Sequence, residues 1–178
     1  MKHTSTVLNQ KGFTLIELIV VFSVMSILAL IGIAGFVTYS RIQALNNAVA
    51  DIKTLLSSAR SYTGSQVSTT CPSGQTFTGY QVRFCTTYSG NTKQVCGQCS
   101  AKADYELDLV CNNTIVYPSV VTKQLPSGVR VNGSLCQYFQ FNPISSSVVG
   151  AGSVTVQYNI TGYVKSQTVS VSSAGLVQ

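Results

Sequence analysis

The sequence has little charge and almost no histidine. Charged residues make up 9% of its 178 residues, and His3 is the only histidine. Its few lysines and arginines are scattered, so no basic run indicates a nucleic-acid patch. Polarity comes mainly from Ser, Thr, Gly and Tyr, a balance more typical of a secreted or surface protein than of a cytosolic enzyme. The length suits one globular domain with one appendage.

A long apolar run lies near the N-terminus. From Phe13 to Val37 the only strongly polar residue is Glu17. As a helix, this run could cross a hydrocarbon core of about 30 Å. A secretory signal explains this run poorly, because the apolar region of such a signal is shorter, about 7–15 residues, and ends at a cleavage site. The simpler alternative is a plain single-span anchor, with Lys2 and Lys11 holding the N-terminus in the cytoplasm.

Glu17 argues against the plain anchor. A carboxylate inside a spanning helix costs about 2.5–3.5 kcal/mol, and such residues usually have a partner or a function. No other residue of the run could pair with it. The partner of Glu17 must therefore lie outside the run.

The stretch KGFTLIE, residues 11–17, followed by an unbroken apolar helix, resembles the N-terminal signature of type IV pilins and of the pseudopilins of type II secretion. The resemblance covers roughly residues 5–40. It implies that prepilin peptidase cuts between Gly12 and Phe13 on the cytoplasmic side and methylates the new amine. It also implies that Glu17 pairs with the N-terminal amine of a neighbouring subunit in a filament. In the first helical turn, a carboxylate is also favoured by the helix dipole.

The resemblance also argues against catalysis. It implies that His3 lies in a leader that is removed from the chain. The mature chain would then hold no histidine, which excludes a Ser-His or Cys-His nucleophile. The glycines are dispersed among turns and form no phosphate-binding loop. We expect no enzyme and no cofactor.

Many major pilins carry a proline about twenty residues into the mature helix, and this chain departs from that pattern. Gly32 and Gly35 occupy the region instead. Each glycine weakens a helix by about 1 kcal/mol relative to alanine, which allows local softening without a fixed kink. The missing proline favours a minor subunit.

Beyond the apolar run, the helix is expected to continue with an apolar stripe and to end at Gly64. The stripe could be a coiled-coil seam, but it lasts under three heptads. We favour a face on which a C-terminal sheet packs. Its apolar members are Ile42, Leu45, Val49, Ile52, Leu56 and Ala59.

Residues 65–178 indicate β structure. Asn112 and Asn113 separate two of the alternating runs and predict a tight hairpin, since Asn tolerates positive φ. The expected strands are Tyr80–Thr87, Tyr105–Cys111, Thr114–Tyr117, Val129–Val131, Leu135–Phe141, Val154–Ile160 and Val164–Val171.

Three carboxylates, Asp104, Glu106 and Asp108, alternate along one expected strand and would share a face. Paired catalytic carboxylates and a calcium site are two interpretations. No Asp-rich loop with a turn glycine accompanies them, which argues against calcium. We favour the solvated side of a half-buried strand. The inward residues would then be Tyr105, Leu107 and Leu109.

Six cysteines lie in the expected β domain, and an even count outside the membrane predicts up to three disulfides among 15 full pairings. Cys96 and Cys99 have the spacing of half a zinc site or of a redox motif, but neither has the rest of its context. Cys71 and Cys85 flank a short segment and could face each other across adjacent strands, although the pairing stays open. The candidates are Cys71, Cys85, Cys96, Cys99, Cys111 and Cys136.

Three C-terminal stretches, FNPISSSVVG, SVTVQYNI and VSVSSAGLVQ, resemble the ending of GspH/FimT-like minor pilins, and LLSSARSYTG resembles their helix end. Other minor pilins stay open as an alternative. The resemblance implies an α+β, pilin-like fold, in which a long N-terminal helix packs on an antiparallel β domain. We expect four segments: a leader at 1–12, a membrane and assembly half-helix at 13–37, an amphipathic half-helix at 38–64, and an extracytoplasmic β domain at 65–178.

We therefore expect a structural subunit of a type IV pilus, type II secretion or competence filament. It would be held by one span in the cytoplasmic membrane before it joins a pilus or pseudopilus. Expected partners are prepilin peptidase, other pilin or pseudopilin subunits, the cytoplasmic membrane and the filament assembly platform. A DNA-capturing minor pilin is the alternative. We favour it less, because only Lys165 is charged after Asn142 and phosphate binding needs converging cations.

Overall fold

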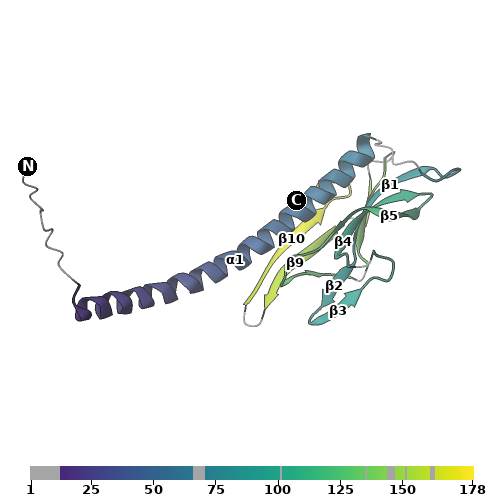
Figure 1. Ribbon diagram of the computed structural model, residues 1–178. Helices are drawn as coiled ribbons and strands as arrows, with labels where there is room; N and C mark the ends of the chain where they lie inside the picture. The colour runs from purple at the N-terminus through teal and green to yellow at the C-terminus, as the bar shows by residue number, and fades with distance from the viewer. Residues whose placement is uncertain are drawn as a thin grey trace, which may run out of the picture. The chain divides into compact units, whose positions relative to one another are not determined.

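A computed structural model describes residues 13–65, 71–100, 102–134, 136–143, 147–150, 152–160 and 163–178. The expected leader, with Gly12, lies outside the described residues. The chain divides into two units, Met1–Ser40 and Arg41–Gln178, and each is described by itself. One helix contributes to both units, and all the strands belong to the second (Figure 1).

The helix, α1, runs from Leu15 to Ser65. It begins two residues after Phe13, the expected first residue, and ends one residue after Gly64. It is continuous through Gly35, where an added Cβ atom would meet nothing within 4 Å. No close packing therefore requires a glycine at position 35.

The strands form two five-stranded sheets. The first sheet has the order β5-β4-β1-β7-β8, and the second has the order β10-β9-β6-β2-β3. Every pairing is antiparallel except β2 with β6, which is parallel. The strands are β1 (Phe77–Phe84), β2 (Thr86–Ser89), β3 (Thr92–Val95), β4 (Tyr105–Cys111), β5 (Thr114–Lys123), β6 (Val129–Asn132), β7 (Tyr138–Phe141), β8 (Val148–Val149), β9 (Gly152–Ile160) and β10 (Tyr163–Val171).

The second half of α1 packs on the sheets through one apolar face, which confirms the predicted α+β, pilin-like arrangement. Five of the six stripe residues are buried, and Ile42 is half-buried. Ala48 and Leu55 widen the buried face. These side chains share one core with inward-facing residues of both sheets, including Val82, Leu107, Val131 and Val156. The stripe is therefore a sheet-packing face rather than a coiled-coil seam.

Most expected strands are present, with shifted ends. The run Tyr80–Thr87 divides at Cys85 into β1 and β2, and the strand after Asn113 extends to Lys123. The short strands β3 and β8 were not predicted. Asn112 and Asn113 have φ values of 48° and 59° and connect β4 to β5, which confirms the predicted hairpin.

A polar contact joins the helix to the first sheet. Asp51 of α1 accepts a hydrogen bond from the Tyr105 hydroxyl at 2.6 Å and pairs with the Lys123 ammonium at 3.2 Å. Burial and this hydrogen bond raise the pKa of Tyr105 above its ordinary value. The contact ties α1 to β4 and β5, so it fixes the helix against the sheet beside the apolar core.

The six cysteines form three disulfides: Cys71–Cys111, Cys85–Cys99 and Cys96–Cys136. The suggested pairing of Cys71 with Cys85 is wrong. The β1–β4 register brings Phe77 opposite Cys111, so the segment before β1 reaches the end of β4. Cys96 and Cys99 bond to different partners and so do not form a CxxC disulfide. Instead, they fasten the loop after β3 at two points.

Candidate functional site

The start of α1 is capped by its own side chains. The Thr14 hydroxyl accepts a hydrogen bond from the Glu17 backbone N–H at 3.4 Å, and it also lies 3.4 Å from the Glu17 carboxylate, to which it donates. The Thr14 carbonyl accepts from the Leu18 N–H at 3.3 Å. Thr14 is therefore the N-cap residue and Glu17 the third helical residue, the positions of a capping box.

The first half of α1 has no packing partner within its unit. Every side chain described between Phe13 and Ser40 is exposed, including the large apolar Phe22 and Phe36. Among the described residues, α1 is the one helix long and apolar enough to cross a membrane, by length and composition. Exposing such a large apolar surface to water is unfavourable. Lipid or other helices must therefore cover it.

Glu17 lies at the start of this apolar surface. No ion pair among the described residues includes it. The hydrogen bond from the Thr14 hydroxyl to the Glu17 carboxylate is long, at 3.4 Å, and exposed to solvent. It therefore occupies little of the hydrogen-bonding capacity of the carboxylate. The arrangement presents a carboxylate at one end of a bare apolar helix, where a cation from another chain could reach it. Gly12, the other expected processing residue, falls outside the described residues, and Phe13 is exposed.

The structure contradicts the predicted solvated face of β4. The Glu106 and Asp108 side chains are each 0% exposed, and every residue of β4 is buried. Asp104 lies just before the strand and accepts a hydrogen bond from the Leu125 N–H at 2.9 Å. The two strand carboxylates do share one face, as the alternation predicts, but that face is closed to solvent.

Arg83 offsets the energetic cost of burying the Glu106 and Asp108 carboxylates. It lies on β1 directly opposite Glu106, and its guanidinium contacts the Glu106 carboxylate and pairs with Asp108 at 3.1 Å. The Ser100 N–H donates to Glu106 at 3.1 Å, so the loop fastened by the Cys85–Cys99 disulfide covers this face. We call Arg83, Glu106 and Asp108 the buried ionic cluster.

Arg83 is a residue of this cluster that the sequence pattern did not predict. A signal was present, because a lone arginine inside the alternating run YQVRF must face away from Tyr80 and Val82. That places it on the same kind of face as Glu106 and Asp108. Only the strand pairing shows that the three meet.

The buried ionic cluster carries two carboxylates and one guanidinium. Burial raises the pKa of the Asp108 carboxyl to about 6, and the Glu106 carboxylate adds to the rise, whereas Ser119 and Arg83 act in the opposite direction. Asp108 therefore takes up a proton at a higher pH than an ordinary aspartate does.

Cys85, Cys99 and Glu106 place possible metal-ligand atoms within 4.8 Å of one another. The two sulfurs are bonded to each other as a disulfide, so neither is a thiolate. Metal binding by sulfur requires the deprotonated thiol. As it stands, this group is a disulfide packed on the buried ionic cluster and does not form a metal site.

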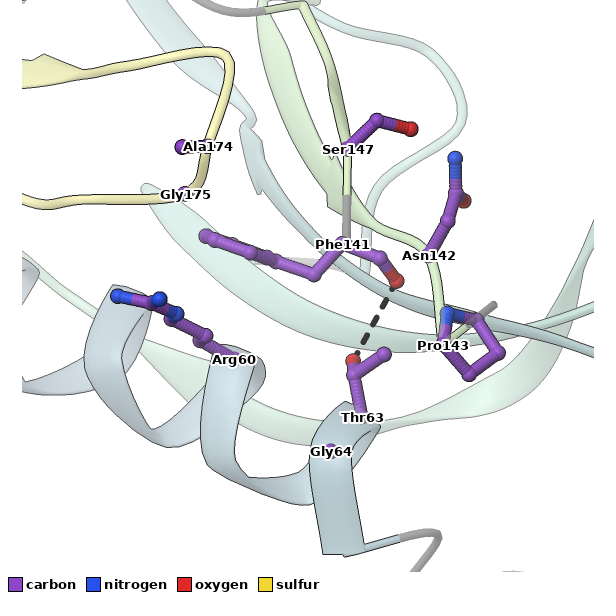
Figure 2. Close-up of a pocket in the computed structure, with 9 residues that line it drawn as sticks. All are labelled: Arg60, Thr63, Gly64, Phe141, Asn142, Pro143, Ser147, Ala174 and Gly175. Atoms are coloured by element: carbon purple, nitrogen blue, oxygen red, sulfur yellow. Dashed lines mark hydrogen bonds between the residues drawn. The ribbon is translucent and has the colours of Figure 1, made fainter. Parts of the chain in front are cut away.

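The stretches FNPISSSVVG and VSVSSAGLVQ meet the stretch LLSSARSYTG at the end of α1. Figure 2 shows Arg60 and Thr63 from the helix facing Phe141 and Gly175 across a cavity of about 130 Å³. The Thr63 hydroxyl lies 3.3 Å from the Phe141 carbonyl and donates to it. Gly175 has a φ of 75°, and an added Cβ atom would lie 3.3 Å from Val148. These segments form a tight junction of the helix end, β7 and the C-terminus.

Comparison with known proteins gave one match. Residues 8–33 match the family model described as the prokaryotic N-terminal methylation motif. No curated protein and no solved structure matched the chain. The match spans the capped helix start and supports a type IV pilin-like protein that is processed at its N-terminus and anchored by one apolar helix.

Proposed function

We propose that the chain is a minor pilin or pseudopilin, a structural subunit that assembles into a bacterial filament through its N-terminal helix. The observation that carries the proposal is the exposed carboxylate of Glu17 at the start of a wholly exposed apolar helix. Its position inside the methylation-motif match adds support. Other apolar helices would cover the helix surface, and the methylated amine of a neighbouring Phe13 would pair with Glu17. An ion pair formed on assembly would offset the cost of the charge in lipid.

The proposal includes processing and topology. Residues 1–12 are a leader that prepilin peptidase removes, 13–37 form the membrane and assembly half of the helix, and 38–64 form its amphipathic half. Residues 65–178 are an extracytoplasmic β domain. The β domain stays outside the cytoplasmic membrane until the subunit joins the filament through its assembly platform.

The GspH/FimT-like subtype is also part of the proposal. Its support is the junction at the end of α1, where the short motifs Phe141-Asn142-Pro143 and Gly175-Leu176-Val177 lie close to Arg60. In this junction, each of the two motifs packs beside the helix end.

The proposal is tested by two variants that separate assembly from helix capping. Glu17→Ala removes the carboxylate, whereas Thr14→Ala removes the N-cap and keeps the carboxylate, at a cost of about 1 kcal/mol in helix stability. We expect Glu17→Ala to be inserted and cleaved but absent from the sheared filament fraction, and Thr14→Ala to be present there. Mass spectrometry of the mature protein should find N-methyl-Phe13.

Two outcomes contradict the proposal. One is an intact leader in cells that contain active prepilin peptidase. The other is a normal amount of Glu17→Ala protein in filaments. Loss of both variants from filaments, with normal cleavage, would assign Glu17 a helix-starting role instead of an intersubunit one.

A second candidate function, DNA capture, is favoured by one observation on the second sheet. On its outer face, the side away from the core, Tyr88 lies opposite Lys93, and the Arg130 guanidinium lies 4.6 Å from the centre of the Tyr88 ring. No strand of the second sheet contains a carboxylate. An aromatic ring between two cations suits stacked bases and phosphates of single-stranded DNA.

This candidate is tested by fluorescence anisotropy with a labelled oligothymidine at two salt concentrations. DNA capture predicts binding that weakens as salt rises, and weakens further in Arg130→Ala and Lys93→Ala. Binding that does not respond to salt, or that both variants retain in full, would exclude this role.

A further inference from the structure

The outer face of the first sheet carries a second set of polar side chains, beside the buried ionic cluster. By register, Gln81 of β1 lies between Asp108 of β4 and Gln140 of β7, and Arg83 lies between Glu106 and Tyr138. The carboxylates lie on the β4 side, under the disulfide-fastened loop. Gln81, Gln140 and Tyr138 lie on the β7 side, where the face is open.

On this open side the surface is hollowed into a groove. Two adjoining hollows of about 450 and 500 Å³ share Asn113, Tyr138 and Gln140. One extends to Pro143 and Val149, and the other extends to Gln98. Each volume falls within the range of about 300–1,000 Å³ that is usual for ligand sites.

The groove is lined by amide side chains. Gln81 is 6% exposed as a residue and lines the groove. Asn113, Gln140 and Asn142 line the same groove. Each amide offers two donors and one acceptor, which matches hydroxyl groups that both donate and accept.

The charge of the lining indicates a neutral ligand. No carboxylate is among the described residues that line either hollow. Of the described lining residues, Arg83 is the only cation, and its guanidinium already pairs with Glu106 and Asp108. An ionic ligand would therefore find no free counter-charge.

The strands at the floor of the groove argue against a peptide. Extended peptides bind sheets by pairing with an edge strand, but the groove runs across the inner strands β1 and β7 and reaches the edge strands only at Thr114, Ile115 and Val149. The groove instead offers the ring of Tyr138, which is 38% exposed and presents an apolar face with a hydroxyl at its tip. A sugar ring has the matching surface, an apolar face of C–H groups with hydroxyls at its rim.

We propose that this groove binds a short neutral oligosaccharide, with Tyr138 under a sugar ring and the amides of Gln81, Gln140 and Asn113 on its hydroxyls. The site shares no residue with the exposed first half of α1, nor with Tyr88, Lys93 and Arg130 of the second sheet. Its failure would leave the filament proposal untouched.

The test uses the full chain in a detergent without a sugar headgroup, because glucoside and maltoside headgroups would compete for the groove. Cellotetraose, maltotetraose and chitotetraose serve as neutral probes, with a heparin tetrasaccharide as the charged probe, and binding is measured by calorimetry. We expect at least one neutral probe to bind with a Kd below about 1 mM, and the heparin tetrasaccharide to bind more weakly.

Tyr138→Ala and Gln81→Leu should each weaken binding at least about tenfold. Thr168→Ala, on an exposed position of the second sheet, is the control and should bind normally. Gln140→Ala, a half-buried position, replaces any groove variant that lacks the wild-type melting temperature. Absence of binding by all three neutral probes, full binding by folded groove variants, or equal binding of the heparin tetrasaccharide would overturn the proposal.

Discussion

At the residue scale, the buried ionic cluster combines two negative charges and one positive charge in a space closed to solvent. Removing one partner of such a cluster leaves a buried charge without compensation, which is far more destabilising than losing a surface ion pair. Among the described residues, Arg83 is the one cation paired with these two carboxylates, so both lose their counter-charge when it is removed.

We predict that Arg83→Met destabilises the β domain by about 3–5 kcal/mol. The Met side chain keeps an apolar stem of similar length but leaves Glu106 and Asp108 without a cation. Urea unfolding of the disulfide-bonded chain measures the change. Arg130→Met, which removes a guanidinium from the half-buried outer face of the second sheet, is the control and should cost about 1 kcal/mol or less.

The protonation of Asp108 predicts a pH dependence of stability. Its pKa of about 6 in the folded chain lies above the ordinary value of 3.8, so the folded state binds this proton more tightly than the unfolded state does. The resulting stabilisation is complete below about pH 4 and is lost as the pH rises through about 6, up to about 3 kcal/mol in all. The groups that act on the pKa of Asp108 are Ser119 of β5, Glu106 of β4 and Arg83 of β1, and Gln81 of β1 lies opposite it in the register.

The measurement compares unfolding free energies at pH 5 and pH 7. The gain in stability at pH 5 should shrink in Asp108→Asn, because an amide does not titrate in this range. Asp51→Asn removes a carboxylate that is 41% exposed and should leave the gain in place. An unchanged gain in Asp108→Asn would show that the proton binds elsewhere.

At the scale of elements, α1 is one helix with two environments. Its second half is held by the core and by Asp51, whereas its first half exposes all its described side chains. Gly35 lies in the exposed half and has no packing reason to be glycine. A weak point at this position would let the helix soften when subunits pack in a filament.

We predict that Gly35→Ala reduces filament assembly, because it strengthens the helix locally by about 1 kcal/mol. Membrane insertion and leader cleavage should be unchanged, and immunoblots of the sheared and cell fractions measure the effect. Gly64→Ala is the matched control, since an added Cβ atom there also meets nothing within 4 Å. Normal assembly of Gly35→Ala would show that softening near residue 35 is not needed.

At the scale of the whole molecule, three disulfides hold the β domain, and no cysteine is free. Disulfides persist in oxidising compartments and are rare in the cytosol. The oxidation state of the six cysteines therefore reports on which side of the membrane the domain lies.

We predict that thiol alkylation of the denatured protein from intact cells labels none of the six cysteines. A chain that lacks residues 13–37 would stay in the cytoplasm and should be labelled at all six. Glu17→Ala is the control, because it should insert normally and stay unlabelled. Labelling of the wild-type chain would place the domain in a reducing compartment.

Local pattern was enough to predict several features of this protein. The apolar run with Glu17, the stripe on the second half of α1 and the Asn112-Asn113 hairpin depend on residues close together in the chain, so spacing reveals them. Spacing also shows that Glu106 and Asp108 share a face. The match at residues 8–33 supports the same N-terminal interpretation.

Only the tertiary structure decided the features that join distant segments. The predicted solvated face of β4 is buried because Arg83 arrives from β1 and a loop fastened at Cys85 and Cys136 closes over it. The pairing of Cys71 with Cys111 depends on the register of β1 with β4. Alternation along a strand shows which side chains share a face, but what covers that face is set by chain folded from elsewhere.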